Sequence, residues 1–273
     1  MAQLLFYRQP EMLNRYRHRH LRMQPVENAY GFARQTNSTV LTLAEFGIAS
    51  RVYPILFAGD ATGKPVPVVL LGVRSDENLF VDADGRWDAA YVPAFVRRYP
   101  FVLAEDGGQW NVCIDRAYPG FVDDVDSDLG TPLFGDDNEP LPTLRGSIDF
   151  LEAFQRTFEH TVAFAAELAA HDLLTEVHAV ADVGEAGRFS LSGLLAVDEA
   201  RLAAMPADVL QRWLMDGTMK AVMAHRLSLD LLPQLALRLR ERMPATSASG
   251  DPAPEAVAAT NANANADTDA IEA

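Results

Sequence analysis

The chain has 273 residues, of which 49% are hydrophobic and 22% charged, a composition typical of a globular protein and not of a disordered or fibrous one. Its formal net charge of -15 argues against sequence-independent binding to nucleic acid or anionic lipid, because both require a positive surface. The single cysteine, Cys113, excludes an intramolecular disulfide and a cysteine-built zinc site.

No apolar stretch in the sequence is long enough to span a membrane. The longest uninterrupted run, 66–73, is far shorter than the roughly 20 residues that a membrane helix needs. The first residues contain no apolar region of signal-peptide length. We therefore expect no membrane insertion and a cytoplasmic location, with export to the cell surface without a Sec signal as the alternative.

Residues 38–118 are expected to form a largely antiparallel sheet. Apolar runs at 53–58 and 66–73 flank a turn signal, and the runs 101–104 and 110–114 flank Glu105-Asp106-Gly107-Gly108, a hairpin signature. A further strand is expected at 78–81. Connections this short favour antiparallel neighbours. A short helix is expected to be inserted at 89–99, with Pro93 in its first turn.

The second half is expected to be mainly helical, with one β-hairpin. Apolar residues at steps of three and four predict a helix over 147–172, with Ser147 as its N-cap. The runs 177–183 and 188–197 flank Gly184-Glu185-Ala186-Gly187 and predict the hairpin. Helices are expected from about Asp198, Pro206 and Gly217, with a kink or restart near 228–230 because Pro233 lacks an amide hydrogen.

Together these elements predict an α+β fold in a single domain over residues 1–244, strand-rich up to 145 and mainly helical from 146. The remaining tail, 245–273, is rich in alanine and asparagine and contains no basic or aromatic residue. Such a segment cannot bury enough apolar area to offset its chain entropy. We therefore expect the tail to be disordered.

Three groups of residues resemble metal or nucleophile sites, and each has a simpler interpretation. The acidic run 124–130 begins like a calcium loop, but Leu129 and Gly135 stand where that loop requires glycine and glutamate. His160, Glu167 and His171 share one side of a helix but spread over about 16 Å of its length. Cys113 is expected to be a buried structural thiol. We therefore expect no metal site, no cofactor and no catalytic residue.

Residues 87–101 are the most unusual stretch, with five aromatic residues, two arginines and two prolines. Aromatic rings beside arginine can form a pocket that binds a carboxylate. The alternative is a helix packed on the sheet, with Arg97 and Arg98 at its C-terminal end. The basic run 15–22 can be an anion or nucleic-acid contact, but the net charge favours a strip that docks on the protein's own acidic loops or lies on the surface.

Spaced segments across the chain resemble the bacterial SapC family. They include His18-Arg19-His20-Leu21-Arg22, Tyr53-Pro54-Ile55-Leu56-Phe57, Asn78-Leu79-Phe80-Val81-Asp82, Trp87-Asp88-Ala89-Ala90-Tyr91-Val92-Pro93, Arg98-Tyr99-Pro100-Phe101, Pro132-Leu133-Phe134 and Leu191-Ser192-Gly193-Leu194. The resemblance covers roughly residues 10–242. It implies a link to bacterial surface-layer proteins, to serum resistance and to outer-membrane, TonB-dependent uptake receptors, and it supplies no catalytic residue.

Three hypotheses about function follow. The first is a non-enzymatic accessory protein that binds a protein or peptide partner in a surface-layer or outer-membrane uptake pathway. The second is a small-molecule-binding protein or an enzyme, with His18 and Glu45 as acid/base groups if the fold brings them together. The third is a homodimer, because the leucine-rich stretch 227–239 is wider than one core face needs. The candidate ligand- or partner-binding residues are Trp87, Tyr91, Arg97, Arg98, Tyr99, His18, Glu45 and Asn78.

Overall fold

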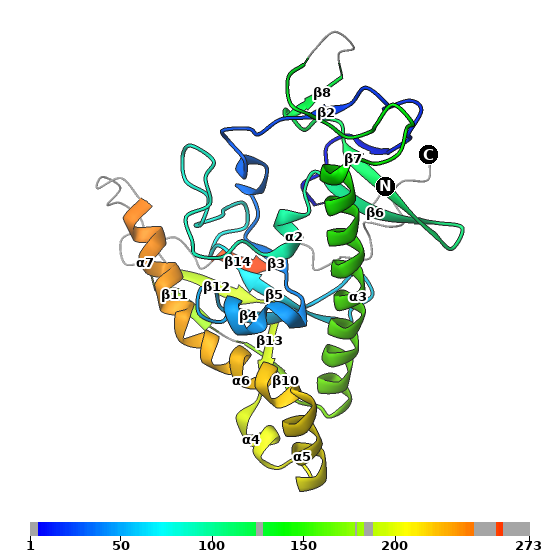
Figure 1. Cartoon of the computed structure of the whole chain (residues 1–273). Helices are drawn as coiled ribbons and strands as arrows, with labels where there is room; N and C mark the ends of the chain where they lie inside the picture. The colour runs from blue at the N-terminus through cyan, green and yellow to red at the C-terminus, as the bar shows by residue number, and fades with distance from the viewer. Residues whose placement is uncertain (1–4, 124–127, 178, 183–187, 243–254, 259–273) are drawn as a thin grey trace.

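A five-stranded antiparallel sheet forms the centre of the computed structural model, which describes residues 5–123, 128–177, 179–182, 188–242 and 255–258 (Figure 1). The strand order is β10-β13-β4-β5-β3. Their bounds are β3 Ser38–Val40, β4 Ile55–Gly59, β5 Pro65–Leu70, β10 Leu174–Glu176 and β13 Leu194–Val197. Strands β4 and β5 form the predicted hairpin, whose turn is held by Asp60 accepting from the amides of Thr62 and Lys64.

Helices lie on two sides of this sheet. The long helix α3 (Pro142–Ala170) packs against β5, and α6 (Thr218–Ser228) packs against β4 and β13 (Figure 1). The apolar residues of α3 recur at helical spacing, and the middle and C-terminal ones join the main core. The helix begins earlier than the predicted Ser147 because Pro142, which has no amide hydrogen, suits the first helical turn.

A second layer is built from the N-terminal half. Strands β1 (Pro10–Met12), β7 (Gln109–Asp115) and β6 (Phe101–Asp106) form one small sheet, and β6–β7 is the predicted second hairpin of this half. Strands β8 (Phe121–Val122), β2 (Arg22–Met23) and β9 (Thr131–Pro132) form another. Short helical turns connect these parts: η1 Gly31–Ala33, η2 Leu43–Glu45, α1 Phe46–Ala49 and α2 Ala94–Arg97.

The C-terminal half matches the predicted order of a hairpin followed by helices. Strands β11 (Ala179–Asp182) and β12 (Arg188–Ser192) pair antiparallel, and β10 pairs with β13 beyond them. Helix α4 (Glu199–Ala203) is capped by Asp198, which accepts from the Arg201 amide. Helix α5 (Ala207–Asp216) ends at Gly217, whose φ of 90° favours glycine. The turn η4 (Leu229–Leu231) separates α6 from α7 (Leu232–Arg242), as Pro233 requires.

The predicted tail lies almost wholly outside the described residues, so its disorder stays a prediction. The structure describes only Glu255–Ala258 of it, as strand β14 parallel to β12. The other described strand pairs are antiparallel. The predicted α+β class and the largely antiparallel pairing are therefore confirmed.

Two local predictions were wrong. Residues 78–81 form no strand, because the buried Asn78 side chain donates to the Ala33 carbonyl and accepts from the Phe80 amide, leaving Val81 in a single bridge to Trp87. The inserted helix spans only Ala94–Arg97 instead of 89–99. A residue that precedes a proline avoids the helical conformation. Val92 precedes Pro93, so the helix starts only after Pro93.

Among the helices in the described part of the chain, none is both long enough and apolar enough to span a membrane.

The leucine-rich stretch 227–239 is only partly buried. Leu235 and Leu239 belong to the core, whereas Leu227 and Leu237 are 69% and 52% exposed. The core therefore uses part of this stretch, and dimerisation stays a prediction.

Candidate functional site

Glu45 is the centre of a closed hydrogen-bond network beside α2. Its carboxylate is buried and accepts four hydrogen bonds, from the Thr42 amide (2.9 Å), the Thr42 hydroxyl (2.7 Å), the Tyr91 hydroxyl (2.7 Å) and the Ala94 amide (2.7 Å). Burial and the Glu45 carboxylate raise the pKa of Tyr91 to about 12. This network ties η2 to the start of α2.

Trp87 belongs to the same closed region. Its indole Nε1 donates to the Tyr53 hydroxyl (2.8 Å) and to the Tyr91 carbonyl (3.1 Å), and the Tyr53 hydroxyl in turn donates to that carbonyl. The polar atom of the half-buried Trp87 is therefore satisfied within the chain. Trp87, Tyr91 and Glu45, three of the predicted site residues, lie together but serve to fix the loop before α2.

An open region adjoins this network, where two hollows of about 420 and 390 Å³ share a wall. We call it the aromatic–arginine groove. The shared wall consists of Arg97, Tyr99, Tyr118 and Phe150. The first hollow is completed by Ala29, Tyr30, Phe32 and Val96, and the second by Met23, Arg98, Pro100, Phe101, Thr143, Gly146 and Ser147. None of the described residues that line either hollow is acidic.

Arg97 is the exposed cation of this groove. Its guanidinium lies 5.7 Å from the ring centre of Tyr91 and 5.1 Å from that of Phe150. Its Nε donates to the Val92 carbonyl at 3.0 Å and an Nη to the Tyr91 hydroxyl at 3.4 Å. Arg97 has no carboxylate partner among the residues that the structure describes. Within the described residues, the groove therefore contains a guanidinium that is held on two rings and has no acidic partner.

Arg98 and Tyr99 form the inner wall of the groove. The buried Arg98 places its guanidinium 3.8 Å from the ring centre of Phe95. The Tyr99 ring stacks on Phe32 with centres 3.9 Å apart, and its hydroxyl donates to Asp115 at 3.1 Å. Burial, and after it the Asp115 carboxylate, raises the pKa of Tyr99 above its ordinary range. Both side chains are fixed, so this wall is preorganised.

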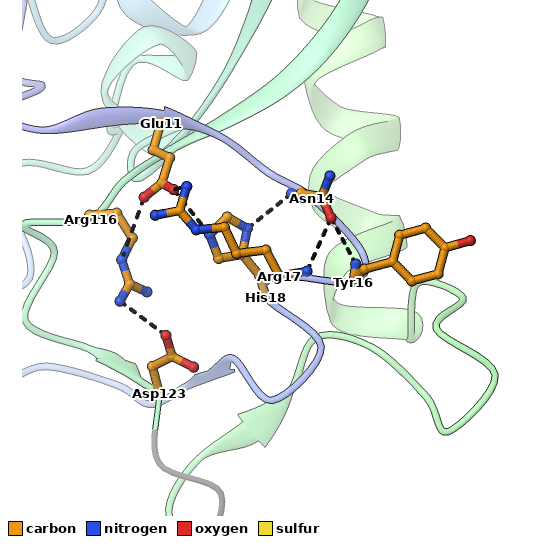
Figure 2. Close-up of polar contacts among 7 residues, drawn as sticks. All are labelled: Glu11, Asn14, Tyr16, Arg17, His18, Arg116 and Asp123. Carbon is orange, nitrogen blue, oxygen red and sulfur yellow. Dashed lines mark hydrogen bonds and ion pairs between the residues drawn. The ribbon is translucent and has the colours of Figure 1, made fainter.

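His18 lies in a separate, internally paired cluster (Figure 2). Its buried ring accepts from the Asn14 amide through Nδ1 at 2.9 Å, and Nε2 lies 3.4 Å from Glu11. Glu11 also pairs with Arg17 at 2.5 Å and with Arg116 at 3.9 Å. Burial, more than any neighbouring charge, lowers the pKa of His18.

The structure does not bring His18 and Glu45 into one site. The partners of His18 are Asn14 and Glu11, whereas those of Glu45 are Thr42, Tyr91 and Ala94. Among the described residues, no hydrogen-bond or ion-pair partner is common to His18 and Glu45. An acid/base pair formed by these two residues therefore has no geometric support.

Asn78 lines a larger cavity of about 870 Å³ beside α7. The four arginines of this cavity are each bonded to the chain itself: Arg34 to the carbonyls of Asp82 and Ala83, Arg74 to Glu77, Arg238 to Asp88, and Arg242 to the Asn78 carbonyl. Its size alone does not make it the better candidate, because two of these arginines pair with carboxylates of the cavity itself and the contacts of Arg238 and Arg242 fasten α7 to the 74–88 loop.

The remaining candidates from the sequence carry no site in the described part of the chain. No group of three or more histidine, cysteine, aspartate or glutamate side chains there is arranged to hold a metal ion. Glu167 is bonded to Arg212 (2.5 Å) and to the indole of Trp213 (2.8 Å), because α5 covers this end of α3. Cys113 is buried, and burial raises its pKa to about 11. Residues 124–127 of the calcium-like run lie outside the described residues.

The family model SapC matches residues 13–235, which is most of the chain. The chain belongs to the SapC family. Comparison with curated proteins and with solved structures gave no match.

The candidate residues predicted from the sequence of this SapC protein include part of the groove. Arg97, Arg98 and Tyr99 lie on it, whereas Tyr30, Phe32, Tyr118 and Phe150 were not predicted. Phe150 lies one helical turn before Phe154 on the apolar side of α3, so nothing in the sequence distinguishes it from a core residue. The other three come from distant loops, and no local pattern connects them to Arg97.

Proposed function

We propose that this SapC protein is a non-enzymatic accessory protein that binds a protein or peptide partner through the aromatic–arginine groove. The observation that carries the proposal is the exposed Arg97 guanidinium, which packs on Tyr91 and Phe150 and has no carboxylate partner among the described residues. A guanidinium fixed on aromatic rings attracts a carboxylate and can bind it through two parallel hydrogen bonds.

The shape of the groove favours an extended partner segment. Two hollows adjoin along one wall, and Arg97 belongs to that wall. A segment that places an acidic side chain on Arg97 can direct a neighbouring apolar or aromatic side chain into the hollow lined by Tyr30 and Phe32. The partner class that fits is therefore a peptide segment with an acidic residue next to an aromatic or large apolar residue.

Family membership supports the proposed pathway. The resemblance to SapC proteins implies a partner in surface-layer assembly or outer-membrane, TonB-dependent uptake, and we place the protein in the cytoplasm with signal-independent export as the alternative. Fractionation of the host cells distinguishes the two locations. A protein recovered with the outer membrane or the culture medium contradicts the cytoplasmic proposal.

A small-molecule ligand is the second candidate function. Each hollow has a volume within the 300–1,000 Å³ range typical of small-molecule sites, at about 420 and 390 Å³. A small carboxylate ligand uses the same Arg97 contact. The two candidates differ in how affinity depends on the length of the ligand. A peptide partner gains affinity from residues on both sides of the acidic one, whereas a small carboxylate does not need them.

The test uses two fluorescein-labelled hexapeptides, identical except that a Phe-Glu pair in one is Phe-Gln in the other. Fluorescence polarisation at about 0.15 M salt limits repulsion from the acidic protein, since the Debye length is then about 8 Å. We expect the Glu peptide to bind the wild type and Arg97→Gln to weaken it by about tenfold or more. The Gln peptide should respond little to Arg97→Gln.

The matched control is Arg156→Gln, an exposed arginine further along α3 that pairs with Glu152. It removes the same charge without changing the groove. Equal affinity of wild type and Arg97→Gln for the Glu peptide overturns the proposal. Binding of benzoate or N-acetyl-phenylalanine as tightly as the hexapeptide supports the small-molecule candidate instead.

A further inference from the structure

Gly146 is an exposed glycine inside α3, and nothing within the described chain explains it. Its backbone has helical geometry, so no left-handed conformation requires glycine there. An added Cβ would meet nothing within 4 Å, so no neighbour excludes a side chain. Glycine inside a helix is less stable than alanine because it loses more backbone entropy on folding. Neither conformation nor packing therefore accounts for the residue.

The position of Gly146 in the groove is specific. It lines the second hollow together with Arg97, Arg98 and Phe150. Thr143, Gly146, Ser147 and Phe150 are spaced three, four and seven residues apart and therefore share one face of the helix. The absence of a side chain at 146 keeps the hollow open one turn before Phe150, the ring that holds the Arg97 guanidinium.

We propose that the main chain of the bound partner passes over α3 at Gly146, so that this glycine determines which partners fit. The inference rests on the proposed function and deepens it. A peptide backbone can approach a helix closely only where no Cβ intervenes. With the main chain at Gly146, an acidic side chain reaches Arg97 and a neighbouring apolar side chain reaches the aromatic hollow. The partner class is then an extended peptide.

The experiment uses the full chain and the same Glu and Gln hexapeptides. Gly146→Leu places a side chain in the hollow and is expected to weaken binding of the Glu peptide by about tenfold or more, because the leucine then occupies the space that the peptide main chain needs. Gly146→Ala is expected to weaken it by about threefold while raising the denaturant midpoint of unfolding. A loss of affinity in Gly146→Ala cannot be attributed to misfolding, because alanine stabilises a helix more than glycine does.

Gly47→Ala is the matched control. Gly47 is an exposed glycine in α1, an added Cβ there also meets nothing within 4 Å, and it lines neither hollow. It should leave peptide affinity unchanged. N-acetyl-phenylalanine serves as a probe without an extended main chain, and Gly146→Ala should hardly affect its binding.

The outcomes separate this inference from the proposed function. If Arg97→Gln weakens the Glu peptide while Gly146→Leu and Gly146→Ala bind it like wild type, the inference is overturned and the proposed function stands. If the wild type binds neither hexapeptide, both are overturned. A loss of affinity in the Gly146 variants that is absent in Gly47→Ala supports the inference.

Discussion

The basic run 15–22 and the groove around Arg97 both contain arginines, but the side chains that contact these arginines differ. In the run, Arg15 pairs with Glu139 at 2.6 Å and Arg17 with Glu11 at 2.5 Å, while Arg22 donates to backbone carbonyls. In the groove, Arg97 rests on two rings and has no described carboxylate. A density of arginines in the sequence therefore does not locate a binding site, because the chain itself supplies carboxylate partners for some of them, as it does for Arg15 and Arg17.

The groove also differs from the adjoining hydrogen-bond network around Glu45. Glu45 is buried and accepts four hydrogen bonds, so its charge is satisfied inside the molecule. Arg97 is exposed and contacts this network at Tyr91, whose hydroxyl donates to Glu45. Changes in the closed region should lower stability, and changes in the open region should alter binding.

Glu45→Ala provides the strongest test of this division. It leaves the donors of Thr42, Tyr91 and Ala94 without their acceptor, and unsatisfied buried donors are costly, so we expect a loss of about 4 kcal/mol in the free energy of unfolding. Urea denaturation measures it. Glu45→Gln keeps one acceptor oxygen and should lose about half as much. A loss below about 1 kcal/mol in Glu45→Ala would show that the network is not structural.

Acid should destabilise the protein through the buried His225. Its Nε2 accepts from the Val197 amide (3.0 Å) and its Nδ1 donates to the Ile55 carbonyl (2.8 Å), so the ring is neutral and joins α6 to β13 and β4. Burial lowers its pKa from 6.5 to about 4. The unfolded chain therefore binds the proton first, and stability falls as the pH drops from about 6.5 towards 4.

Between pH 7 and pH 4.5 we expect His225 to lower the free energy of unfolding by about 2 kcal/mol, since one pKa unit corresponds to about 1.36 kcal/mol and pH 4.5 still lies above the pKa of the folded state. Urea unfolding at pH 7 and pH 4.5 should show a smaller pH dependence in His225→Gln than in wild type. Carboxylates and His18 contribute equally to both proteins, so the difference isolates His225. His160→Gln, at an exposed position on α3, is the control. An unchanged pH dependence in His225→Gln contradicts the prediction.

Tyr99→Phe separates structure from binding within the groove. It removes the hydrogen bond from the hydroxyl to Asp115 but keeps the ring on Phe32. We expect about 1 kcal/mol less stability and an unchanged affinity for the Glu hexapeptide. Thermal unfolding and fluorescence polarisation measure the two effects. A large loss of affinity would mean that the partner uses the hydroxyl directly.

Arg17→Gln should have the smallest effect. The Arg17 side chain is 74% exposed, and exposed ion pairs contribute less than about 1 kcal/mol. Peptide affinity should match that of wild type, in contrast to Arg97→Gln. If Arg17→Gln weakens the Glu peptide as much as Arg97→Gln does, the distinction between the two regions fails.

Local sequence patterns predicted most of the elements for identifiable reasons. Turn signals at 59–64 and 105–108 and the apolar periodicity of 148–168 act over a few residues, and the corresponding hairpins and helix are present. The helix expected at 89–99 is shorter for a local reason, because it starts only after Pro93. The error at 78–81 arose where the Asn78 side chain bonds to the distant Ala33. Contacts between segments far apart in sequence override local preference.

The sequence by itself determined the α+β class, the hairpins, the main helices and the family, because short-range periodicity, turn chemistry and spaced motifs are written in consecutive residues. Only the tertiary structure decided which arginines are neutralised. Arg15 meets Glu139 and Arg97 meets Phe150, pairs separated by many residues. Charge compensation depends on distances of a few ångströms in space, which no local pattern in this chain specifies.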